Sequence, residues 1–110
     1  MIKLPMPPST NSLFRNVAGV GRVQTKTYKR WRKEAGWALK EQKVIPVSAA
    51  YFLDITVERK GRRDISNCIK AIEDLLVRHQ VTPDDEMCQG VNIRWSKTVE
   101  KAPTVRVVVT

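Results

Sequence analysis

The side chains best suited to chemistry are carboxylates, which cluster in a chain that has few of them. Asp84, Asp85 and Glu86 are consecutive and follow Pro83, and Asp64 lies earlier in the sequence. Adjacent carboxylates repel one another, so a bound cation stabilises such a group. Hard oxygen ligands hold Mg²⁺, which activates water and neutralises charge on a phosphate. This set is therefore suited to phosphodiester cleavage.

A cationic side chain accompanies these carboxylates. Lys70 follows Asp64 by about one and a half helical turns, so its ammonium group could stabilise a phosphate in the transition state. Lys70 also has a simpler interpretation, an i,i+4 ion pair with Asp74 worth about 0.2–0.5 kcal/mol. Asp64 likewise suits the start of a helix, where a carboxylate caps free amide groups. Spacing alone leaves both interpretations open.

Composition indicates the partner. The 110 residues contain 20 Lys and Arg against 11 Asp and Glu, which gives a net charge of +9. The electrostatic field of such a net positive charge attracts polyanions, and nucleic acid is the first candidate partner. Ribosomal, structural and membrane-surface proteins are also basic, so charge alone does not settle the function. Cys68 and Cys88 lack the spacing of a zinc site, and the single histidine, His79, suits a surface position at a helix end.

We expect a single domain over residues 1–110, because this length supports only one core. The chain contains no apolar run near the roughly 18 residues of a membrane span, and its first residues do not resemble a signal peptide. These features predict a soluble, cytoplasmic protein with no membrane partner.

The elements that must position these residues follow from apolar periodicity. Apolar steps of three and four residues predict two helices, the first with Thr25 or Thr27 as its cap, and alternation predicts strands. The expected fold class is α+β, a small mixed sheet layered with two main helices. The predicted order is strand 2–4, loop 9–21, helix 26–43, strand 49–57, helix 65–78, loop 81–87 and strands 91–95 and 105–109.

Basic side chains gather in the predicted loop, along the first helix and before the second helix. Trp31 lies among the helical cations, but its place on the apolar stripe favours a core anchor over a base-stacking role. The cations suit phosphate contacts, although a solvated surface explains the loop about equally well. The candidate DNA-binding residues are Asn11, Arg15, Arg22, Lys26, Lys29, Arg30, Arg62 and Arg63.

Three segments, in order, resemble the RusA-like Holliday junction resolvases, and the resemblance covers nearly the whole chain. Leu4 to Asn11 is similar to the proline-rich opening of that family. Arg62 to Lys70, RRDISNCIK, is similar to its basic-D-x-D-N-x-x-K helix start, and Pro83 to Glu86 to its later acidic pair.

The resemblance implies a homodimeric endonuclease that uses Mg²⁺, or Mn²⁺, to nick four-way DNA junctions symmetrically in recombination and repair. It implies Asp64 and Asp85 as metal ligands and catalytic residues, Lys70 as the catalytic cation, and Asp84 as a neighbouring candidate ligand. It also suggests a bacterial cytoplasmic protein, encoded by the host, a phage or a prophage.

The sequence departs from the family pattern at one position, where Ser66 replaces the second aspartate. A hydroxyl is a poorer Mg²⁺ ligand than a carboxylate. Three explanations remain open: Ser66 ligates through water while Asp84 or Glu86 supplies charge, the chain binds branched DNA without cutting it, or the serine is an engineered inactivation. A basic RNA-associated protein is a further alternative.

Overall fold

The computed structural model describes residues 1–8, 12–58, 65–96 and 104–110. Four predicted site residues, Asn11, Arg62, Arg63 and Asp64, lie outside these ranges. The other predicted site residues are described, so their positions can be compared with the predictions.

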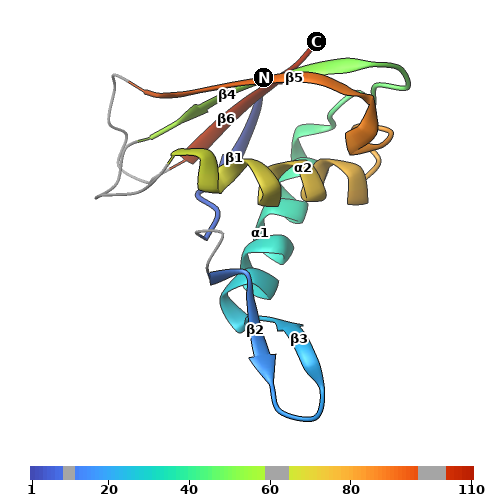
Figure 1. Ribbon diagram of the computed structural model, residues 1–110. Helices are drawn as coiled ribbons and strands as arrows, with labels where there is room; N and C mark the ends of the chain where they lie inside the picture. Colours follow the sequence, from blue (N-terminus) through green and yellow to red (C-terminus); the bar gives the residue numbers. More distant parts are fainter. Residues whose placement is uncertain (9–11, 59–64, 97–103) are drawn as a thin grey trace.

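A four-stranded mixed sheet forms one layer (Figure 1). Its order is β1-β6-β4-β5, with both β1 and β4 antiparallel to β6, and β4 parallel to β5. The parallel pair requires a crossover, which α2 provides between the two strands. The predicted α+β class is confirmed. The strand bounds are β1 Ile2–Pro5, β4 Tyr51–Val57, β5 Cys88–Trp95 and β6 Thr104–Val109.

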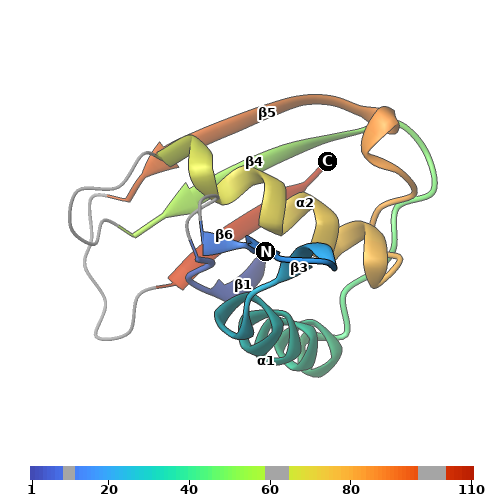
Figure 2. The same cartoon turned by 60° about the horizontal axis from the view of Figure 1, so that its bottom comes forward.

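Two helices, α1 (Lys26–Gln42) and α2 (Ile69–Arg78), cover one face of this sheet (Figure 2). The Thr25 side chain caps α1 by accepting a hydrogen bond from the Tyr28 amide at 3.2 Å, so the first of the two predicted caps is the observed one. The second predicted helix begins as a 3₁₀ turn, η2 (Ile65–Cys68), before α2.

The core lies between the helices and the sheet. Trp31 is only 4% exposed, and its indole Nε1 donates a hydrogen bond to the Pro5 carbonyl at 2.9 Å, which confirms its predicted role as a core anchor. In the part of the chain that the structure describes, no helix covers the other sheet face (Figure 2). The alternation and register of β4 and β6 place two exposed apolar side chains there, Phe52 and Val108. No helix in the described ranges has the length and apolarity needed to cross a membrane.

The predicted loop 9–21 is wrong in part, because residues within it form a β-hairpin. Strands β2 (Phe14–Val17) and β3 (Gly21–Gln24) pair antiparallel, and they project beyond the start of α1 (Figure 1). The hairpin turns at Gly19, where φ is 76°, a backbone conformation that glycine adopts without a steric penalty. The Phe14 ring packs edge-on against Tyr28 at 5.8 Å and thereby attaches the hairpin to α1.

Candidate functional site

The consecutive acids lie in a short 3₁₀ turn, η3 (Asp85–Met87), directly before β5. Asp84 caps this turn, since its Oδ1 accepts a hydrogen bond from the Glu86 amide at 3.3 Å. The Asp84 carbonyl also accepts a hydrogen bond from the hydroxyl of the buried Tyr51, at the start of β4. The turn is thus attached to the sheet while its carboxylates remain exposed to solvent.

The carboxyl groups of Asp84 and Asp85 influence each other's pKa. A hydrogen bond between their carboxyl groups lowers the pKa of Asp84 and raises the pKa of Asp85. Adjacent carboxylates repel each other when both are ionised, and a divalent cation would relieve that repulsion. The oxygen donors of this turn therefore suit a hard metal ion.

A further carboxylate, Glu73, interacts electrostatically with Asp85 of the acidic turn. Its side chain is half-buried on α2, and burial, followed by the charges of Asp85 and Asp74, raises the pKa of Glu73. The charge of Lys70 opposes this shift. Glu73 was missed from the sequence, although its spacing of three residues from Lys70 on α2 could have indicated it.

Lys70 forms the simpler of its two predicted interactions. Its Nζ lies 3.7 Å from Asp74 Oδ2, and both side chains are about half exposed. The charge of Asp74 also contributes to the raised pKa of Asp85. Asp74 and Glu73 therefore interact both with Lys70 and with the acidic turn. Ser66 is an exposed residue of η2, one helical turn before Lys70.

The described residues do not complete a metal site by themselves. Within the described ranges, no group of three or more His, Cys, Asp or Glu side chains is arranged to hold a metal ion. The fit is therefore partial: the acidic turn supplies the right donor chemistry at one position, and Asp64, a predicted ligand, lies outside the described residues. Any metal held here needs ligands beyond Asp84 and Asp85.

The predicted DNA contacts that the structure describes lie on the hairpin and the adjoining part of α1. The Arg22 guanidinium stacks over the Phe14 ring at 4.0 Å, which holds this cation on the hairpin. The exposed predicted cations on these two elements are Arg15, Arg22, Lys26, Lys29 and Arg30.

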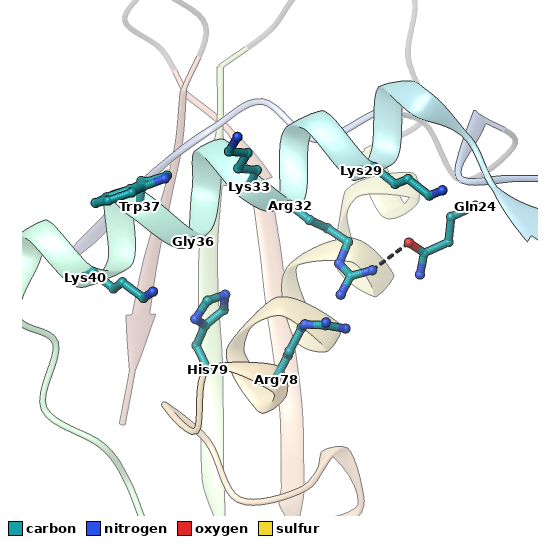
Figure 3. A pocket seen from close by; sticks show the side chains of 9 residues that line it. All are labelled: Gln24, Lys29, Arg32, Lys33, Gly36, Trp37, Lys40, Arg78 and His79. Atoms are coloured by element: carbon teal, nitrogen blue, oxygen red, sulfur yellow. Dashed lines mark hydrogen bonds between the residues drawn. The ribbon is translucent and has the colours of Figure 1, made fainter.

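A pocket of about 470 Å³ opens between α1 and the end of α2 (Figure 3). The sequence did not reveal it, because residues far apart in the chain form it. His79 follows α2 and stands opposite Gly36 of α1, which confirms the predicted helix-end position, although the imidazole is half-buried. The pocket is lined by Gln24, Lys29, Arg32, Lys33, Gly36, Trp37, Lys40, Arg78 and His79.

The described structure thus combines a mixed sheet layered with two helices, exposed cations on the hairpin and α1, and a separate turn of carboxylates. A family model, endodeoxyribonuclease RusA, matches residues 5–110. The chain therefore belongs to the RusA family of endodeoxyribonucleases. A comparison with individually curated proteins finds no match.

Proposed function

We propose that this protein is a divalent-metal-dependent endonuclease that resolves four-way DNA junctions by paired, symmetric nicks. The observation that carries the proposal is the family match over residues 5–110, and the adjacent carboxylates of the acidic turn support it. A DNA-recombination role suits the cytoplasm of a bacterium, with the gene carried by the host, a phage or a prophage.

The residues divide into two groups in this proposal. Asp64 and Asp85 would hold Mg²⁺ or Mn²⁺, with Asp84 and Ser66 as further candidate ligands, and an ion held there would supply activation of water and neutralisation of charge on the phosphate. Lys70 stabilises the anionic transition state through its ammonium group. Its ion pair with Asp74 is exposed, so a phosphate can compete for the ammonium at small cost.

The cationic residues hold the DNA arms. Arg15 and Arg22 on the hairpin and Lys26, Lys29 and Arg30 on α1 contact phosphates, while Asn11, Arg62 and Arg63 act near the cut strand. Each phosphate neutralised in this way releases counterions, so binding should weaken steeply as salt rises.

The test is incubation of the wild-type protein with a labelled four-way junction in Mg²⁺ or Mn²⁺. We expect metal-dependent nicks at symmetric positions in two opposing strands, and none in a linear duplex of the same sequence. EDTA should abolish nicking without abolishing junction binding. Binding without nicking, at any pH and with either metal, would contradict the proposal.

That contrary result would favour a second candidate, a branched-DNA-binding protein that has lost most or all of its cleavage activity. Ser66 in place of an expected aspartate supports this alternative. Duplex RNA serves as the competitor for the remaining alternative: equal affinity for RNA and for the junction would favour an RNA-associated protein.

We also propose that the protein acts as a homodimer, since two symmetric nicks require two active sites and a two-fold protein matches a two-fold substrate. The uncovered sheet face is the candidate contact surface. Phe52 is 55% exposed there, and Val108 lies diagonally across from it on β6. An adjoining groove of about 330 Å³ includes Met1 and Ile45, both of which are exposed.

Phe52→Lys should therefore weaken the dimer about 30-fold or more, because it replaces an exposed apolar side chain at the proposed contact with a charge. Sedimentation equilibrium measures the effect, and Val20→Lys is the matched control, since Val20 is exposed on the distant hairpin turn. A monomeric wild-type protein would refute the homodimer. A dimer that Phe52→Lys leaves unchanged would place its interface elsewhere.

A further inference from the structure

We propose that the pocket between α1 and the end of α2 binds an unpaired stretch of a DNA strand, holding its phosphates with cations and stacking a base on Trp37. The assignment rests on the proposed nucleic-acid function, but it concerns residues separate from the acidic turn. It adds recognition of single-stranded DNA to the duplex contacts of the hairpin.

The charge of the pocket selects an anion. Among the described residues that line it, none is acidic and five are cationic: Lys29, Arg32, Lys33, Lys40 and Arg78. Such a concentration of like charge is relieved when phosphates bind, and a concave site focuses the field. The Arg32 guanidinium is held by Gln24, whose Oε1 accepts its hydrogen bond at 2.6 Å. A guanidinium has five donors, so this contact orients Arg32 and leaves donors for a phosphate.

Trp37 supplies a surface for a base. It is 61% exposed, whereas Trp31, on the same helix, is 4% exposed and packs in the core. Lys40 Nζ lies 5.8 Å from the Trp37 ring centroid, so a cation flanks the exposed indole (Figure 3). Bases within a duplex are already stacked on their neighbours, and only an unpaired base can offer its face to the ring. The exposed indole therefore favours an unpaired strand over a duplex.

His79 lines the side of the pocket opposite α1 and packs closely against Gly36. A Cβ atom added to Gly36 would lie 2.9 Å from His79 Nε2, so the absence of a side chain at Gly36 allows the imidazole to approach α1. Burial, and then the charges of Lys40 and Arg78, lower the pKa of His79. The imidazole is therefore mainly neutral near pH 7, with one nitrogen to donate and one to accept a hydrogen bond.

Fluorescence anisotropy with a labelled short oligo(dT) and with a duplex of equal length tests the proposal. Trp37→Leu should weaken oligo(dT) binding about 5- to 150-fold, the equivalent of one lost base stack, and leave duplex binding nearly unchanged. Trp37→Phe is the matched control, because it keeps an aromatic ring at the same exposed position and should retain most of the oligo(dT) binding. Equal losses for both ligands, or no loss for oligo(dT), would overturn the proposal.

His79 gives an independent readout because it is the only histidine in the chain. Bound phosphate should raise the pKa of His79, because its negative charge offsets the positive charges that line the pocket. These charges belong to Lys29, Arg32, Lys33, Lys40 and Arg78. NMR titration of the imidazole with oligo(dT) should show this rise, and an unchanged pKa would count against the pocket. The two proposals can fail separately. A protein that does not nick junctions but still binds oligo(dT) through Trp37 would refute the proposed nuclease function and support the proposed pocket.

Discussion

Asp85→Asn is expected to reduce metal-dependent nicking of a four-way junction about 1000-fold, while junction binding stays equal or becomes tighter. The amide has no charge to hold the cation, and metal stabilisation of the transition state is worth several kcal/mol, each 1.4 kcal/mol being tenfold in rate. The measurement combines a single-turnover nicking rate with a binding isotherm in Ca²⁺ or EDTA.

The control for Asp85→Asn is Glu41→Gln, which removes one negative charge from an exposed position on α1. Both variants raise the net charge equally, so a general electrostatic effect on DNA binding would appear in both. Asp64→Asn should match Asp85→Asn in its loss of nicking. Undiminished nicking by Asp85→Asn would remove Asp85 from the proposed metal site.

Ser66→Asp is expected to raise the nicking rate about 10- to 100-fold at low Mg²⁺ and to lower the Mg²⁺ concentration needed for half-maximal rate. The estimate follows from the effect that groups supporting a metal site commonly have on metal affinity or activity. The added carboxylate supplies a charged oxygen ligand where a hydroxyl now stands. A Mg²⁺ titration of the single-turnover rate measures both changes.

Ser48→Asp provides the matched control, since Ser48 is exposed between α1 and β4. A gain specific to Ser66→Asp would identify the missing carboxylate as the limitation of the native protein. If Ser66→Asp brings no gain in a protein that already nicks, other carboxylates, such as Asp84 or Glu73, would have to supply the charge.

Much of the fold could be predicted because local periodicity matches tertiary burial. The stripe of Tyr28, Trp31 and Leu39 is buried along α1, and the alternation of β4 places Leu53 and Ile55 in the core. The hairpin was missed because its strands are short and rich in Arg, Asn and Gln, so alternation is weak. Its pairing depends on a glycine turn and on the contact of Phe14 with Tyr28.

The candidate site was less predictable, because it depends on which residues distant in sequence approach one another. Adjacent acids such as Asp84 and Asp85 are visible in the sequence, but the approach of Glu73 on α2 to them depends on how the helix packs. The pocket is a stronger case, since it requires Gly36 and His79 to meet across two helices. Neither residue carries a local signal for that meeting.

The residues of the candidate site belong to two structural layers, because the hydrogen bond from the Tyr51 hydroxyl to the Asp84 carbonyl attaches the acidic turn to the sheet. The acidic turn is attached to the sheet through β4, while Lys70 and Glu73 belong to the helical layer. The separation between these carboxylates and the Lys70 ammonium is therefore fixed by the packing of α2 on the sheet, through buried residues such as Ile72 and Leu76. A core substitution under α2 would thus change the geometry of the proposed site without touching any of its polar side chains.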